Sequence, residues 1–291
     1  MSSDPRLDAL RSLADTGVKL ARGTTSARLA VAGLRDLVDP ATLPPEVRER
    51  AVTELEKAHA QATRPMAFKE VEKALKDAWG EKPTSVLDAL DEEPVACTPA
   101  AQVHRGVHDG APVAVKVLRP GLAEAVRNDL NLLDALIRPI AGVFPSLQPG
   151  VLLREVRERI LDELDLEHEA STQRTFARAL RRSATLHVPA PLSDLCHERV
   201  LVSAWVDGTP VTELTDPAQR RAAARALVAF HVGSARLGTV HADPHPGNAL
   251  LMGDGRLAVL DFGAVRRVPA ERVDEALVAL AAFLAGEAET L

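Results

Sequence analysis

His241-Ala242-Asp243-Pro244-His245-Pro246-Gly247-Asn248 is the segment from which the architecture of this chain can be inferred, and two short apolar runs follow it. The turn Gly253-Asp254-Gly255 separates these runs, and Asp-Gly between apolar runs predicts a β-hairpin. A hairpin returns the chain to the point where it began, so we expect Asp261 to lie close to Asn248 and Asp243. Two carboxylates and one carboxamide would then surround a single point.

This trio suits phosphoryl transfer. A carboxylate and an amide oxygen are ligands that Mg²⁺ prefers, and a further aspartate lies near the acceptor group in such sites. The order H-x-D-x-x-x-x-N, then a strand and Asp261-Phe262-Gly263, matches the catalytic-loop pattern of protein kinases. We therefore expect Asn248 and Asp261 to hold Mg²⁺ and Asp243 to be the catalytic aspartate.

Two other interpretations of the loop stay open at this point. His241, Asp243 and His245 alternate as H-x-D-x-H, and on an extended strand they would point the same way and could bind zinc. Pro244 and Pro246 argue against such a regular strand. Because Asp, Pro, Gly and Asn all favour turns, the stretch could also be a loop without chemistry.

A lysine inside an apolar strand is the second candidate feature. Residues 102–108 and Val113-Ala114-Val115-Lys116-Val117 flank Asp109-Gly110, which predicts a second hairpin. A lysine is rarely buried without a partner. In a kinase-like strand Lys116 would bind the α- and β-phosphates of ATP and be braced by a helix glutamate, whereas an edge-strand lysine would only extend to water.

The acidic run from residue 162 to 169 could supply that brace. We expect one long helix over about 152–182, in which Asp165 and Glu169 are one turn apart and share a face. Further helices are predicted at about 46–60, 67–79, 217–237 and 270–284 from their apolar spacing. Like charges at this density cost stability unless a cation offsets them, which favours pairing of one carboxylate with Lys116.

Composition excludes several classes of protein. The 291 residues carry a net charge of -6, which gives no basic surface for nucleic acid. Two cysteines cannot form a disulfide framework, and the polar start Met1-Ser2-Ser3-Asp4-Pro5 is not typical of a signal peptide. Apolar runs are too short to span a membrane. We therefore expect a cytoplasmic protein.

The chain resembles the UbiB family of atypical protein-kinase-like proteins, also called ABC1, AarF or ADCK-like. The resemblance runs from about residue 30 to the end of the chain and rests on a set of motifs in a fixed order. These are Gln102-Val103-His104-Arg105-Gly106, Val113 to Gly121, Glu163-Leu164-Asp165 with Glu169-Ala170, Trp205-Val206-Asp207-Gly208, the loop 241–248 and Asp261-Phe262-Gly263.

The resemblance implies an α+β fold, namely a bilobal protein-kinase-like fold with an N-terminal helical extension and helical insertions in the N-lobe. The expected parts are the extension (1–90), the N-lobe (91–206) and a C-lobe (207–291). It implies the following site residues: ATP contacts from Lys116, Ala96 and Gln102, with Glu169 paired to Lys116; catalysis by Asp243; Mg²⁺ at Asn248 and Asp261; and an E-x-D pair at Glu163 and Asp165.

Two motifs and the C-terminal end depart from the family pattern. The K-x-G-Q motif, which pairs with the E-x-D carboxylates in the family, is replaced by Val31-Ala32-Gly33-Leu34. The alanine-rich nucleotide loop is Val95-Ala96-Cys97-Thr98-Pro99-Ala100-Ala101, where Pro99 lacks an N–H that could meet a phosphate. The chain also ends one predicted helix after Asp-Phe-Gly, so we expect a short C-lobe.

The resulting hypothesis is a UbiB-type atypical kinase or ATPase that binds Mg-ATP and acts in isoprenoid-quinone or other lipid metabolism. An isoprenoid or lipid ligand and peripheral contact with a membrane are the expected partners besides ATP. A nucleotide-binding pseudokinase that acts as a regulatory scaffold is the alternative, because several motifs have diverged. A phosphotransferase of a small polar molecule shares the loop but does not account for Gln102-Val103-His104.

Overall fold

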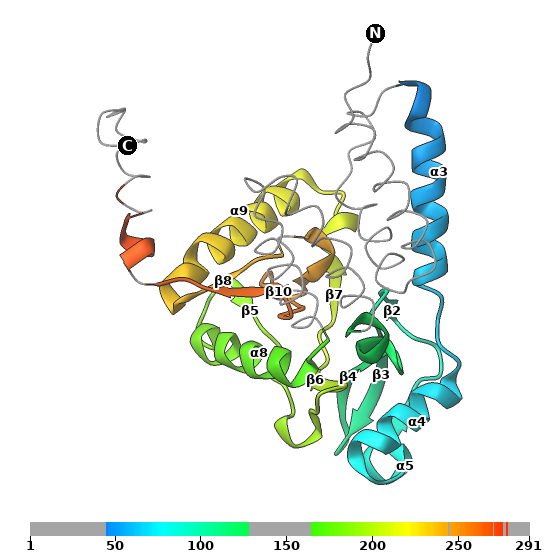
Figure 1. The fold of residues 1–291 in the computed structure, drawn as a ribbon. Coiled ribbons are helices and arrows are strands. Elements are labelled where there is room, and N and C mark those ends of the chain that lie inside the picture. The colour runs from blue at the N-terminus through cyan, green and yellow to red at the C-terminus, as the bar shows by residue number, and fades with distance from the viewer. Residues whose placement is uncertain (1–44, 128–163, 244, 270, 276–277, 279–291) are drawn as a thin grey trace, which may run out of the picture. The chain divides into compact units, whose positions relative to one another are not determined.

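The computed structural model describes residues 45–127, 164–243, 245–269, 271–275 and 278, which form helices and strands (Figure 1). Its contacts divide the chain into two compact units. The first comprises residues 1–110 and 114–164, and the second comprises residues 111–113 and 165–291. The predicted part boundaries at residues 90 and 206 stay predictions.

The described part of the first unit begins with two helices at the predicted places. They are α3 (Pro45–Ala62) and α4 (Phe68–Trp79), and the single turn α5 (Pro83–Val86) follows. Helix α4 buries Val71, Ala74 and Leu75, which share one face because they are three and four residues apart. Gly80 ends α4 with φ of 75°, and its N–H donates to the Lys76 carbonyl over 2.8 Å.

Four strands follow these helices: β1 (Ala89–Leu90), β2 (Ala96–Cys97), β3 (Ala101–His108) and β4 (Ala111–Leu118). Strand β3 lies between β1 and β4 and also pairs with β2. The predicted Asp-Gly turn joins β3 to β4. Asp109 and Gly110 have φ of 50° and 72°, the two left-handed residues that a type I′ hairpin needs.

The second unit contains two longer helices and seven strands among its described residues. The helices are α8 (Leu166–Leu180) and α9 (Pro217–Ser234). The strands are β5 (Leu186–His187), β6 (Val200–Ala204), β7 (Gly208–Pro210), β8 (Thr239–His241), β9 (Ala249–Met252), β10 (Leu257–Val259) and β11 (Val265–Arg267). Short 3-10 helices lie at Ser193–Leu195, Val211–Glu213, Ala235–Leu237 and Pro246–Asn248. One sheet has the order β5-β10-β9-β7, and β8 pairs with β11.

The predicted helix over 152–182 needs a correction. Helix α8 begins at Leu166, and Asp165 is its N-cap with extended φ and ψ of -119° and 92°. The Asp165 carboxylate accepts the His168 N–H over 3.0 Å, which satisfies a donor of the first turn. Asp165 therefore lies outside the helix and does not share a helical face with Glu169. Residues 152–163 lie outside the described part of the chain.

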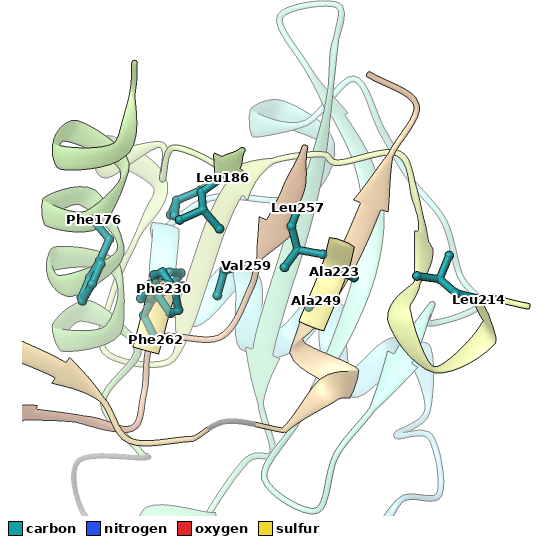
Figure 2. Packing of buried hydrophobic residues seen from close by; sticks show 10 residues of the cluster. Phe176, Leu186, Leu214, Ala223, Phe230, Ala249, Leu257, Val259 and Phe262 are labelled. Carbon is teal, nitrogen blue, oxygen red and sulfur yellow. The ribbon is translucent and has the colours of Figure 1, made fainter. Parts of the chain in front are cut away.

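An apolar cluster with three phenylalanines forms the core of the second unit (Figure 2). Phe176 comes from α8, Phe230 from α9, and Phe262 follows β10. The ring centroids of Phe176 and Phe230 are 5.6 Å apart, and those of Phe176 and Phe262 are 5.1 Å apart. Such tilted aromatic pairs add stability beyond their buried area. The rings therefore fix the chain at Phe262, directly after Asp261.

Candidate active site

The hairpin of β9 and β10 brings the metal-binding candidates together. Ala249 pairs with Val259, and the Leu260 N–H donates to the Asn248 carbonyl over 2.8 Å. The next residue along the chain, Asp261, is thus held beside the start of the hairpin. This predicted hairpin is confirmed by the structure. Its tip carries an ion pair between Arg256 and Asp254 at 2.8 Å.

Asp243 and Asn248 form a direct side-chain pair. The Asn248 Nδ2 donates to Asp243 Oδ2 over 2.6 Å, and the His245 N–H donates to Asp243 Oδ1 over 3.3 Å. The pair fixes the carboxamide so that its nitrogen faces Asp243, which leaves its oxygen for a cation. A Cβ at Gly247 would lie 2.8 Å from the His245 ring nitrogen, so a larger residue there would displace the His245 ring.

Asp261 has an uncommon backbone conformation. Its φ of 58° is in the left-handed region, where aspartate is tolerated better than most residues but still stores strain. Its Oδ1 accepts the Gly263 N–H over 3.2 Å. Strand β11 then pairs with β8, with Val265 opposite His241. The backbone on both sides of Asp261 is therefore anchored, which holds the carboxylate in this strained position.

Glu169 reaches the same segment from the first turn of α8. Its side chain is buried, and its Oε1 accepts the Phe262 N–H over 3.4 Å. A Cβ at Gly263 would lie 3.4 Å from Glu169 Oε2 and 3.5 Å from Asp261 Oδ1, so both carboxylates border this glycine. The structure therefore brings Glu169 close to Asp261. Its predicted pairing with Lys116 stays a prediction.

His241 supports the site through a contact with the backbone. Its Nε2 is 2.6 Å from the Asp261 carbonyl oxygen, and its ring is buried against Phe230, His231 and Phe262. Burial lowers the pKa of His241. The carbonyl of Asp261 raises this pKa, His231 lowers it, and the charges of Asp261 and Asp243 raise it. The neutral ring therefore donates from Nε2 to the carbonyl.

The contacts of His241 and His245 weaken the zinc interpretation of the loop. His241 Nε2 is used by a carbonyl, and His245 Nδ1 accepts the Gly247 N–H over 3.1 Å. Among the residues that the structure describes, no group of three or more His, Cys, Asp or Glu side chains is arranged to hold a metal ion. The loop-only interpretation is weakened as well, because Asp243 pairs with Asn248 and the hairpin returns Asp261 to the same end.

The remaining ATP-binding candidates lie in the first unit. Lys116 is half-buried on β4 between the buried Val115 and Val117, as the strand pattern predicts. Ala96 is exposed on β2, where it pairs with Val103 of β3. Both positions are open to solvent at least in part. Their contacts with nucleotide stay predictions.

Gln102 contacts other protein groups of the first unit. Its side chain is fully buried, and Oε1 accepts the Met66 N–H over 2.7 Å. Its Nε2 is 2.7 Å from His104 Nε2, and His104 Nδ1 is 2.8 Å from the Asp91 carbonyl. The Gln-x-His motif thus forms a buried chain of hydrogen bonds that connects three segments of the first unit. Its carboxamide is used by protein groups, and the expected ATP contact of Gln102 stays a prediction.

Only one residue of the E-x-D pair lies within the described part of the chain. Asp165 caps α8, while Glu163 lies outside the described residues. The positions that replace the K-x-G-Q motif, 31–34, also lie outside them. Asp165 has a structural use that sequence spacing does not indicate, because its role as a cap depends on where the helix begins.

The donor set at Asn248 and Asp261 fits Mg²⁺. One carboxylate and one carboxamide oxygen are hard ligands, and Mg²⁺ in phosphoryl-transfer sites takes few protein ligands and completes its shell with phosphates and water. The Asn248 amide is oriented by Asp243 at 2.6 Å, an outer contact of the kind that orients metal ligands. Mg²⁺ bound here would supply charge stabilisation for phosphate oxygens.

Comparison with known proteins identifies the family of the chain. The ABC1 atypical kinase-like domain matches residues 59–291. The chain belongs to the ABC1 atypical kinase-like family. Its fold is accordingly a protein-kinase-like α+β fold, as the motifs predicted.

Individual relatives point the same way. The chain is 34% identical over 174 residues to a "Probable protein kinase UbiB" of Aeromonas hydrophila, which is 56% of this chain and 32% of that protein. It is 30% identical over 262 residues to the "Atypical kinase coq-8, mitochondrial" of Caenorhabditis elegans, which is 85% of this chain and 33% of that protein. The chain therefore spans about a third of the length of these relatives.

A solved structure is similar over nearly the whole chain. The erythromycin complex of Rv3197 from Mycobacterium tuberculosis is 28% identical with a TM-score of 0.61, and the match covers 99% of this chain and 75% of that one.

Among the described residues, no helix has the length and apolar character needed to cross a membrane.

Proposed function

We propose that this ABC1-family protein binds Mg·ATP and turns it over as a phosphotransferase or ATPase. The observation that carries the proposal is the 2.6 Å pair of Asp243 and Asn248 beside Asp261. A structural loop requires neither an aspartate in the left-handed region, such as Asp261, nor a second aspartate oriented by hydrogen bonds, such as Asp243. A site that positions oxygen ligands toward a metal and an acceptor requires both.

Each polar residue of the trio would have a separate task. Asn248 and Asp261 would hold Mg²⁺, and Asp243 would orient the acceptor hydroxyl or water and take up its proton. The Asp243 carboxylate already accepts two hydrogen bonds, which keeps it in place as the acceptor approaches. Catalysis would then depend chiefly on positioning and on electrostatic stabilisation of the transferring group.

The first unit would contribute nucleotide contacts. Lys116, half-buried on β4, would neutralise the α- and β-phosphates, with Glu169 as its brace. The backbone of the nucleotide loop, residues 95–101, would lie against the phosphates, with Ala96 allowing close approach.

We further propose that the acceptor or effector is an isoprenoid or another lipid. This part rests on the resemblance to the UbiB family, and it adds peripheral contact with a membrane. The cytoplasmic location is proposed from the composition. The parts 1–90, 91–206 and 207–291 would serve as extension, N-lobe and C-lobe in this reaction.

A pseudokinase is the second candidate, and Pro99 favours it. This proline removes a backbone N–H from the nucleotide loop. A protein of this kind would bind nucleotide without turnover and act through the conformation that the nucleotide stabilises.

ADP release from purified protein with Mg·ATP tests the proposal. It is measured for the wild type and for Asp243→Asn, with and without lipid vesicles. Asp243→Asn keeps the shape and an acceptor for Asn248 but loses the base, so its rate should fall about 10²- to 10⁴-fold. Nucleotide affinity should change little, because Asp243 is not a metal ligand in this proposal.

Asp254→Asn is the matched control. It makes the same change in charge at the exposed tip of the β9–β10 hairpin, where Asp254 pairs with Arg256. ADP release by this variant should equal that of the wild type. Tight binding of Mg·ATP with no turnover by the wild type would instead support the pseudokinase. Equal rates for Asp243→Asn and the wild type would refute the assigned role of Asp243.

A further inference from the structure

Arg119 joins two distant segments of the first unit. It follows β4, and its guanidinium Nη2 donates to the Arg64 carbonyl over 2.8 Å and to the Thr98 carbonyl over 3.1 Å. Its Nε also donates to the Thr98 carbonyl over 3.4 Å, and its backbone N–H donates to the Ala100 carbonyl over 2.9 Å. We call this set of contacts the Arg119 clamp.

One end of the clamp is the nucleotide loop. Between β2 and β3 the loop forms a tight turn in which the Thr98 N–H and Oγ1 both donate to the Ala101 carbonyl, over 2.8 and 3.1 Å. The Ala101 N–H donates back to Thr98 Oγ1 over 2.9 Å. The turn is therefore internally closed, and the clamp holds its carbonyls at Thr98 and Ala100 from outside.

The other end is the segment that joins α3 to α4. The Arg64 carbonyl accepts from the clamp, and two residues later the Met66 N–H donates to the buried Gln102 Oε1 over 2.7 Å. Gln102 directly follows the loop on β3. The linker is thus tied to the loop at two points, by a charged donor and by a buried amide.

The chemistry of the clamp needs a guanidinium. Burial lowers the pKa of Arg119, while Cys97 and Glu70 raise it, and an arginine remains charged at neutral pH. Hydrogen bonds from a charged donor are stronger than neutral ones, and a planar fork reaches two carbonyls at once. Lysine would keep the charge but offers a single flexible point donor.

We propose that Arg119 is a positioning residue that sets nucleotide affinity by holding the nucleotide loop against the linker between α3 and α4. It acts through the loop backbone and does not itself contact phosphate. The proposal rests on the proposed function, in which this loop binds Mg·ATP. Because the linker follows helix α3, the clamp also ties the nucleotide loop to the segment that leads out of this helix.

Titration with Mg·ATP and steady-state ADP release test this with the full chain. The variants are Arg119→Gln, Arg119→Lys and the control Arg64→Ala. Arg64 is exposed and gives the clamp its backbone carbonyl, so its alanine variant keeps the clamp. We expect both Arg119 variants to raise Kd and KM for ATP about tenfold, as the loss of a charged hydrogen bond implies, with kcat within about twofold. Arg64→Ala should match the wild type.

Hydrogen exchange at the amides of Thr98 and Ala101 supplies a measurement that does not need nucleotide. These amides should exchange faster in both Arg119 variants and at the wild-type rate in Arg64→Ala. Arg119→Lys keeps the charge and the aliphatic stem, so it is the variant to rely on if Arg119→Gln does not fold.

Wild-type affinity in Arg119→Lys would show that Arg119 acts through its charge, which overturns the clamp. Wild-type affinity in both variants overturns it as well, whatever the exchange rates. A wild type that binds no Mg·ATP overturns the proposed function itself, and this result is distinct because it precedes any comparison of variants.

Discussion

Replacing His241 by phenylalanine should separate stability from metal binding. The change removes the 2.6 Å hydrogen bond to the Asp261 carbonyl, and a buried acceptor left without a donor costs about 1–3 kcal/mol. It also removes Nδ1, which is buried and has no hydrogen-bond partner among the described residues. Burying such a group costs about 1–3 kcal/mol, so its removal restores a similar amount.

The ring contacts should survive this substitution. The His241 ring centroid lies 5.4 Å from those of both Phe230 and His231 and 5.3 Å from that of Phe262, and a phenyl ring can keep these neighbours. The free energy of unfolding should therefore change by about 1 kcal/mol or less, the difference of two similar terms. Asp261, however, loses a bond that fixes its strained backbone.

Urea denaturation and Mg·ATP titration measure the two effects. The unfolding free energy of His241→Phe should stay near that of the wild type, while Kd for Mg·ATP rises about tenfold, or about 1.4 kcal/mol. His241→Gln, which keeps a donor, should recover part of the affinity. Asp254→Asn, at the exposed tip of the β9–β10 hairpin, is the control and should bind normally. Unchanged affinity in His241→Phe would refute the view that His241 positions Asp261.

The aromatic core, the buried histidines and the N-terminal segment can each be tested as well. Phe176→Ala, which empties the centre of the aromatic cluster, should lower the unfolding free energy by about 3–5 kcal/mol in urea denaturation, and a loss below about 1 kcal/mol would contradict this packing. Burial lowers the pKa of both His241 and His187, so the unfolded chain binds more protons than the folded protein. The free energy of unfolding should therefore fall as the pH drops below about 6.5, and melting curves recorded over a range of pH can check this. The fall should be smaller in His241→Phe. Deletion of residues 1–40 should change ADP release little, and a large rise would show that this segment restrains the site.

Features with local chemistry can be predicted from the sequence. Both Asp-Gly hairpins form, because the left-handed turn conformations at Asp109 and Gly110 depend on those residues alone. The second hairpin then fixes the distance between Asn248 and Asp261 through backbone pairing. The grouping of these residues with Asp243 can therefore be inferred from the order of residues along the chain.

Features that depend on distant partners cannot be predicted from the sequence. Gln102 is buried because it meets Met66, 36 residues away, and its sequence motif carries no sign of this partner. The first residue of α8 cannot be predicted either, because the acidic residues on both sides of Asp165 have a spacing that fits a helix. An aspartate followed three residues later by the amide it caps is a start signal, but many aspartates share that spacing.

The aromatic cluster is hidden for a third reason. The chain has only 6 phenylalanines, and three of them meet next to the site. Their scarcity is the one signal that points to Phe176, Phe230 and Phe262. No spacing rule relates residues on two helices and a strand end, because tertiary packing alone brings them together.

Titration of Mg·ATP into the wild type and into Asp261→Asn is the decisive measurement of the metal site. Asp261→Asn removes one negative charge from the site but keeps the side-chain shape and an acceptor for the Gly263 N–H. If Asp261 holds Mg²⁺, the wild type should bind in a Mg²⁺-dependent manner and the variant should lose at least about tenfold in affinity. Equal affinity of the two proteins for Mg·ATP would contradict a metal site at Asp261.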